Sequence, residues 1–194
     1  MATTSSAVVN TRRLPGDPGV WIFVGADLLV FGLFFMSFVF ERSKDVELYN
    51  LSQQALNFNY GGINTLILLT SSWFVVLAVH ALKMGRARQV APLLGLGALC
   101  GLAFCVLKVV EYTEKISGGI SMLTNDFYMY YFILTGIHFV HVIAGTVILF
   151  IFWKMARTTA GDGINVVHLE SAATYWHMVD LLWIVLFPLL YLMR

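Results

Sequence analysis

Hydrophobic residues in this chain gather in five long runs, which shorter polar segments separate. Each run has about the twenty apolar residues that a helix needs to cross a bilayer. Because lipid offers no partners to backbone polar groups, only helices or closed barrels span a membrane. The pattern therefore predicts an all-α fold, an integral membrane bundle of five transmembrane helices at residues 20–40, 63–82, 91–110, 127–153 and 172–193. The two longer polar segments, 43–62 and 111–126, are predicted to be loops.

The composition agrees with a membrane protein. Of the 194 residues, 59% are hydrophobic and 12% are charged, whereas soluble domains have about twice that share of charged residues. The net charge of +1 gives no indication of nucleic-acid binding. Residues 1–19 are polar and lack the features of a cleavable signal, so we expect a cytoplasmic tail followed by a membrane domain of residues 20–194.

The positions of Lys and Arg predict the orientation, because cytoplasmic flanks carry an excess of positive charge. A cytoplasmic N-terminus places seven of these residues inside, namely Arg12, Arg13, Lys83, Arg86, Arg88, Lys154 and Arg157. It places five outside, namely Arg42, Lys44, Lys108, Lys115 and Arg194. The dense segment KMGRAR at 83–88 favours a cytoplasmic N-terminus and a periplasmic C-terminus.

Two features of the runs predict how the helices pack. Gly97, Gly101 and Cys105 follow one another at a spacing of four residues, and small residues at that spacing let helix backbones approach closely. We therefore expect the third membrane helix to be packed on both sides. Pro188 is expected to kink the fifth helix near its outer end.

Asp27 lies inside the first apolar run with no cation near it in sequence. An ionisable side chain at the centre of a membrane helix costs on the order of 2.5–3.5 kcal/mol, so such residues are candidates for function. Desolvation disfavours a carboxylate, and we expect Asp27 to carry a proton near neutral pH. Two roles are open, one in handling protons and one as a hydrogen-bonding group that packs two helices.

His138 and His141 are three residues apart in the fourth run, so they share one helical face. One interpretation is a pair of ligands to a metal or haem. The other is a pair of hydrogen-bonding groups between helices, which the sequence favours because metal sites need three or four ligands.

Lys108 and Glu111 come at the end of the third run, at a spacing that allows an ion pair. The interpretation we favour is an interfacial pair whose long side chains reach toward the lipid head groups.

The fifth run carries an unusual set of polar residues on one face. Glu170, Thr174, His177 and Asp180 or Leu181 follow at spacings of three or four residues. This face must turn toward the other helices, because lipid does not solvate it. His177 is expected to pair with Asp180 or with the histidines of the fourth run.

The chain contains no nucleophile motif, no phosphate-binding loop and no metal-binding CxxC or HExxH sequence. Single polar residues scattered over several helices indicate an internal network, so no catalytic and no metal-binding residues are predicted. The sequence leaves two rival hypotheses. One is a stand-alone membrane metalloenzyme that uses His138, His141, His177 and Glu111. The other is a small transporter, which the lack of an internal repeat disfavours.

Five segments of the chain resemble the cytochrome c oxidase subunit III family of the haem–copper oxidases. They are GVWIFVGADLLVF, INTLILLTSS, LKVVEYTEKI, LTGIHFVHVIAGT and LESAATYWHMVDLLWIVLF. The residues that match in them are Asp27, Asn64, Thr65, Ser71, Ser72, Glu111, Tyr112, His138, His141, Glu170, Tyr175, Trp176, His177, Asp180 and Trp183.

The chain departs from the family in four ways. It resembles the short bacterial form, without the first two helices of the long members. Asp27 stands where the family often has Glu, as in the quinol-oxidase members, and Lys108 replaces an uncharged polar residue. The segment LPGDPGVWIF resembles the branch associated with nitric-oxide reductases.

The resemblance implies an accessory, non-catalytic subunit of a respiratory oxidase in the bacterial inner membrane, or alternatively of a nitric-oxide reductase. It implies a catalytic subunit I as partner, which would hold the haem and copper, while this chain binds phospholipid and no metal. It also implies a part in sustaining proton uptake. The residues expected in the proton-related or internal polar network are Asp27, Glu111, His138, His141, Glu170, His177 and Asp180.

Overall fold

The computed structural model describes residues 14–159 and 163–193, and the elements in these ranges are all helical. The predicted tail, with Arg12 and Arg13, and the C-terminal Arg194 lie outside the described residues. The elements are α1 (Pro18–Arg42), α2 (Val46–Gln54), α3 (Phe58–Lys83), α4 (Ala87–Ser117), α5 (Asp126–Thr158), α6 (Val166–Phe187) and the π-helix η1 (Pro188–Leu192).

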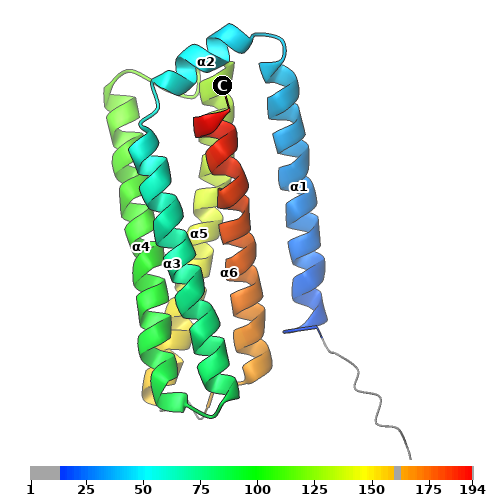
Figure 1. The fold of residues 1–194 in the computed structure, drawn as a ribbon, viewed down its shortest axis with the longest axis vertical. Coiled ribbons are helices and arrows are strands. Elements are labelled where there is room, and N and C mark those ends of the chain that lie inside the picture. Colours follow the sequence, from blue (N-terminus) through cyan, green and yellow to red (C-terminus); the bar gives the residue numbers. More distant parts are fainter. Residues whose placement is uncertain (1–13, 160–162, 194) are drawn as a thin grey trace, which may run out of the picture.

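Five of these helices are long and apolar enough to cross a membrane, as predicted. They run side by side as a bundle, with α2 lying across one end between α1 and α3 (Figure 1). Figure 1 also places the start of α1 and the end of η1 at opposite ends of the bundle. Which end faces the cytoplasm stays a prediction, as does the division at residue 19.

Local sequence signals start the helices. Asp17 caps α1 by accepting a hydrogen bond from the Gly19 amide at 2.7 Å, and Pro18 follows at the first helical position, where proline is favoured. The N-caps of α3, α5 and α6 are all asparagines, namely Asn57, Asn125 and Asn165. Each side chain satisfies an amide that the helix itself leaves unpaired.

The loop predictions were partly wrong. The segment 43–62 contains α2, which Asp45 caps with a 3.0 Å bond from the Leu48 amide. The first part of the segment 111–126 belongs to α4, which continues to Ser117. At a rise of about 1.5 Å per residue, α4 and α5 exceed the hydrocarbon thickness. Polar turns therefore extend these helices beyond the apolar runs, which alone set the predicted bounds.

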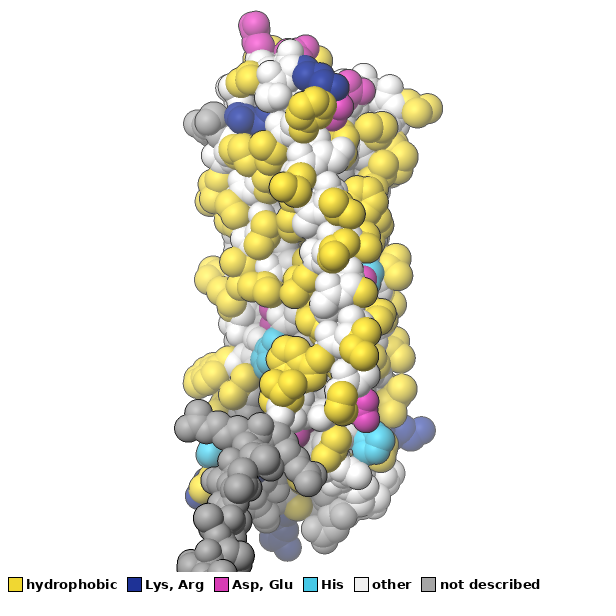
Figure 2. Space-filling view, turned by 90° about the vertical axis from the view of Figure 1, so that its right-hand side faces the viewer, with side chains coloured by type: hydrophobic (Ala, Val, Ile, Leu, Met, Phe, Trp, Pro, Cys, Tyr) yellow, Lys and Arg dark blue, Asp and Glu magenta, His cyan; other side chains and the backbone are white. Residues whose placement is uncertain are grey.

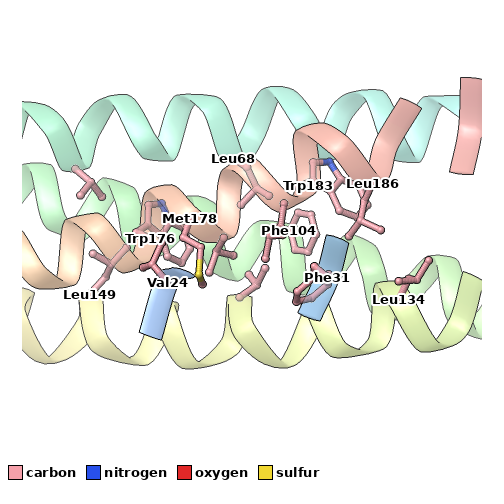
Figure 3. Close-up of a cluster of buried hydrophobic side chains, with 14 of the residues drawn as sticks. Val24, Phe31, Leu68, Phe104, Leu134, Leu149, Trp176, Met178, Trp183 and Leu186 are labelled. Carbon is pink, nitrogen blue, oxygen red and sulfur yellow. The ribbon is translucent and has the colours of Figure 1, made fainter. Parts of the chain in front are cut away.

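The core lies around α6, the most buried of the five membrane helices. Its Trp176 and Trp183 are enclosed by neighbouring helices, and Trp183 meets Phe104 of α4 edge to face at 5.0 Å (Figure 3). Trp176 fits because glycines face it. A Cβ at Gly101 or Gly145 would approach the indole to 2.9 or 2.6 Å.

The predicted packing of the third membrane helix is confirmed. In α4, Gly97 faces Val75 of α3, whereas Gly101 faces Thr146 of α5 and Trp176 of α6. At Pro188 the helix type changes, since α6 ends at Phe187 and the π-helix η1 begins at Pro188; the predicted kink stays a prediction.

The outermost helix, α1, is the least buried of the membrane helices. Val24, Phe31 and Phe38 are its buried residues, and it packs on α5 and α6. The side of the molecule turned toward the viewer in Figure 2 is covered by hydrophobic side chains along its middle, while Lys and Arg lie at its two ends. This distribution suits a surface that lipid covers.

Candidate functional site

The polar residues inside the bundle form separate groups that differ in how well they are enclosed. The most enclosed group joins α4, α5 and η1. The Nζ atom of Lys108 donates to Oε2 of Glu111 at 2.9 Å, and both side chains are buried. The hydroxyls of Tyr131 and Tyr191 donate to Oε1 of Glu111 at 2.8 and 2.6 Å. We call these four residues the closed cluster.

The closed cluster corrects the prediction for Lys108. Its side chain is fully buried inside the bundle, rather than extended toward head groups. The rings of Tyr112, Tyr131, Trp183 and Tyr191 surround its Nζ atom, with centroids 5.1 to 5.8 Å away. Desolvated cation–π contacts of this kind are worth up to about 2 kcal/mol. Together with Glu111 they replace the water that the ammonium group loses.

His138 and His141 serve different environments, although they share a helical face. His138 is fully buried against Trp183, whose ring it stacks on at 5.2 Å, and Phe104. Neither ring nitrogen of His138 has a hydrogen-bond partner among the described residues. His141 instead faces α1, where it lies against Phe31.

Asp27 and His141 form a contact between α1 and α5. Oδ2 of Asp27 lies 2.9 Å from Nε2 of His141, with the side chains 19% and 18% exposed. The ring N–H direction is not aligned well enough for Nε2 to donate along this line, since Oδ2 has no donor by hydrogen-bond geometry. Nδ1 of His141 lies 2.8 Å from the Ile137 carbonyl, so it carries a proton. The contact is thus a close approach of Nε2 and the carboxyl oxygen that joins the two helices.

His177 contacts α3 rather than the histidines of α5. Its Nδ1 is 2.5 Å from the hydroxyl oxygen of Ser72 and 3.9 Å from Oδ2 of Asp180. The expected pairing with Asp180 is therefore a loose contact, and pairing with His138 or His141 is not seen. Neither carboxyl oxygen of Asp180 has a hydrogen-bond partner in the described ranges, although the residue is 4% exposed.

Glu170 joins three segments at the end of the bundle where α1 begins. It contacts Lys83 of α3 at 2.5 Å and accepts a 3.0 Å bond from the Gly16 amide. Gly16 has φ 81°, and a Cβ there would meet Ser171 at 2.9 Å. A side chain at Gly16 would thus oppose both the turn and the close approach.

The four residues of the metalloenzyme hypothesis are not brought together. Glu111 belongs to the closed cluster, His138 is stacked on Trp183, His141 faces Asp27 and His177 faces Ser72. Within residues 14–159 and 163–193, no group of three or more His, Cys, Asp or Glu is arranged to hold a metal ion. The contacts that these residues make in the described ranges join helices to one another.

Some partners in these groups could not be found from the sequence. Tyr131 and Tyr191 supply the donors to Glu111, yet they are twenty and eighty positions from it along the chain. From the sequence, Lys83 is only one of the charges that predict the orientation in the membrane. In the structure its side chain pairs with Glu170. No spacing rule links such distant positions, since tertiary packing alone joins them.

Comparison with known proteins now decides the family. The family model described as "Cytochrome c oxidase subunit III" matches residues 11–194. The chain belongs to the cytochrome c oxidase subunit III family. The predicted family is thus confirmed, and the groups described above are the polar interior of a subunit III.

Named relatives of this subunit III come from several bacteria. "Probable cytochrome c oxidase subunit 3" of Rickettsia conorii is 33% identical over 90% of this chain and 66% of its own length. "Cytochrome c oxidase subunit 3" of Bacillus sp. (strain PS3) is 29% identical over 90% of this chain and 84% of its own. "Quinol oxidase subunit 3" of Bacillus spizizenii is 29% identical over 90% and 85%.

The chain covers different shares of the length of these relatives. The chain spans about two thirds of the length of the Rickettsia protein, as 66% of that protein is covered. The Bacillus relatives, covered to 84% and 85%, are nearer to it in length, as expected for a short form. Their names refer to cytochrome c and quinol oxidases and do not bear on the nitric-oxide-reductase branch, which stays a prediction.

Proposed function

We propose that this chain is the accessory, non-catalytic membrane subunit of a haem–copper oxidase and supports the stability and proton supply of the catalytic subunit. Membership of the subunit III family supports the first part. The second part draws on one observation, that the polar groups inside the bundle bind one another rather than line a reaction site. Lys108 pairs with Glu111, His141 with Asp27 and His177 with Ser72.

Such pairs hold helices together and still allow a proton to be stored. The Asp27–His141 contact joins α1 to α5. Both side chains are partly exposed at the surface of the bundle. A subunit built in this way would keep a titratable group beside the proton path of a catalytic partner without taking part in oxygen chemistry.

Purification of the full chain in mild detergent tests the proposal. A catalytic subunit that contains haem and copper should co-purify, in a complex from a bacterial inner membrane. The gases that the complex consumes would separate an oxidase from a nitric-oxide reductase. The isolated subunit should be colourless, and stoichiometric iron, copper or zinc in it would contradict the accessory role.

Removal of the subunit tests its contribution to turnover. Complexes without it should begin turnover at a rate within a few-fold of the intact complex but lose activity during sustained turnover, with added subunit restoring it. Unchanged activity over the same number of turnovers would contradict a supporting role in proton uptake.

A further inference from the structure

Asp180 is a buried carboxyl group that takes part in none of the hydrogen bonds described above. It lies in the middle of α6, is 4% exposed, and has no hydrogen-bond partner for either oxygen among the described residues. A buried carboxylate without donors is costly, whereas the protonated acid is much less so. Apart from His177 at 3.9 Å, no charged group contacts Asp180 in the described ranges. Lys108 pairs with Glu111, His138 stacks on Trp183, and His141 faces Asp27.

A groove leads from one end of the bundle toward this carboxyl group. It has a volume of about 260 Å³ and lies between α3 and α6. Its mouth is marked by Lys83, Glu170 and His80, and its inner end by His177. A cavity needs only about 10–15 Å³ of such space to hold a water molecule, and water also needs polar partners. The groove satisfies both conditions, since polar groups stand at its mouth and at its inner end.

His177 connects the groove to Asp180. Its side chain is 37% exposed, and Nδ1 lies 2.5 Å from Ser72 and 3.9 Å from Oδ2 of Asp180. Nε2 makes no hydrogen bond in the described part of the chain, so it is available to water. An imidazole can therefore accept a proton at Nε2 and release another from Nδ1. The Ser72 hydroxyl, or one water molecule, bridges Nδ1 of His177 and the carboxyl oxygen of Asp180.

The path ends at Asp180. One turn further along α6, Trp183 packs against Phe104, and Leu68 and Leu186 fill the neighbouring space (Figure 3). These side chains are at most 1% exposed. Protons thus have a polar route to Asp180 from the end where α1 begins. The polar groups beyond it, Thr65 and His138, lie against the buried indole of Trp183, which separates them from Asp180.

We propose that Asp180 is a proton-binding site that exchanges with one membrane surface only, through the α3–α6 groove and His177. A proton from groove water binds Nε2 of His177 as Nδ1 gives up its own proton through Ser72 to the Asp180 carboxylate. Return of the imidazole to its first tautomer resets the relay, and the net change is one proton moved from water to Asp180. This site is separate from the Asp27–His141 pair and does not depend on an oxidase partner.

Infrared spectroscopy of the full chain in lipid nanodiscs tests the site. The difference between wild type and Asp180→Asn should show the C=O stretch of a protonated carboxylic acid at pH 7, which shifts after transfer to D₂O. His177→Gln should slow this shift at least about tenfold, because glutamine keeps a polar group beside Ser72 but cannot relay a proton. Absence of the band, or equal exchange in both proteins, would overturn the proposal.

A second groove variant and a matched control complete the test. Val79→Phe fills the groove without touching a polar group and should also slow the exchange, even if His177→Gln folds poorly. His168→Gln, on an exposed part of α6 outside the groove, is the matched control and should exchange like wild type. In liposomes the wild-type chain should conduct no protons, and a measurable leak would overturn the one-sided path.

Discussion

The closed cluster and the His177–Asp180 region solve the problem of polar groups in a membrane in opposite ways. In the closed cluster, both oxygens of Glu111 are bound, and Lys108 is wrapped by aromatic rings. Around His177, the side chain is 37% exposed and both oxygens of Asp180 lack partners. The difference separates a group that holds the fold together from one that can exchange protons.

The contacts of the closed cluster also explain how a lysine is tolerated inside the bundle. A buried charge is destabilising unless it is paired and its remaining hydrogen-bonding groups are satisfied. Glu111 accepts from two tyrosines and from Lys108, so the negative charge is fully compensated. The cost of this arrangement is interdependence, because loss of one member leaves the others unsatisfied.

The largest effect is expected when the closed cluster is broken on one side. Lys108→Met leaves the Glu111 carboxylate buried without its cation, which should cost about 3–5 kcal/mol of unfolding free energy. Thermal or denaturant unfolding in detergent measures it. The double variant Lys108→Met with Glu111→Leu should recover much of the loss, because no uncompensated charge remains. Additive losses in the double variant would contradict a coupled pair.

A smaller effect is expected at the open region. His177→Leu removes the contact with Ser72, which costs about 1–3 kcal/mol by general estimates but averages nearer 0.6 kcal/mol for hydrogen bonds in membranes. We expect less subunit retained on the complex or a lower thermal midpoint. The initial turnover of assembled complexes should stay within a few-fold. A loss of about a hundredfold with normal subunit content would place His177 in the chemistry.

Asp27→Asn should change reactivity more than stability. Asp27 lies within a membrane-spanning helix and its side chain is 19% exposed, so we expect wild type to react with a hydrophobic carbodiimide near neutral pH. The variant should not react, and its unfolding free energy should fall by about 0.6 kcal/mol. Asp45→Asn, at the exposed cap of α2, serves as the control. Equal labelling and equal turnover in variant and wild type would leave Asp27 only a packing role.

The smallest effect concerns Tyr49 of α2, outside the membrane helices. Its hydroxyl is buried without a partner, and burial raises its pKa to about 12. The folded state disfavours the phenolate of Tyr49. Its contribution to the free energy of unfolding is therefore fully present below pH 10, near the ordinary pKa of tyrosine, and is lost as the pH rises through 12. Tyr49→Phe should be near neutral at pH 7 and resist this alkaline loss, as unfolding at a series of pH values would show.

The sequence predicts the membrane helices well because lipid imposes a minimum apolar length. It predicts helix ends poorly, since Glu111 and Lys115 continue α4 as polar turns beyond the apolar run. It also misses α2, whose capping Asp45 starts a helix too short and polar for the membrane pattern.

The sequence names polar residues of the bundle interior but does not predict which of them contact one another. Asp27 and His141 were both identified, yet only the antiparallel or parallel sense of neighbouring helices decides which polar groups meet. The error at Lys108 has a similar cause. A lysine near the end of an apolar run resembles an interfacial residue, and three of the four aromatic rings that enclose it come from other segments.

The π-helix η1 bears on how the protein is made. Tyr191 lies 83 positions after Lys108, so the ribosome delivers it long after α4 and α5 have entered the membrane. During that interval Glu111 has Tyr131 and Lys108 but lacks its shortest hydrogen bond. The extra residue in the π turn sets the angular position of Tyr191. A one-residue deletion within Pro188–Leu192 would then turn Tyr191 to another face of the helix. Glu111 would stay without this donor, and the incompletely packed chain would be exposed to quality-control proteases.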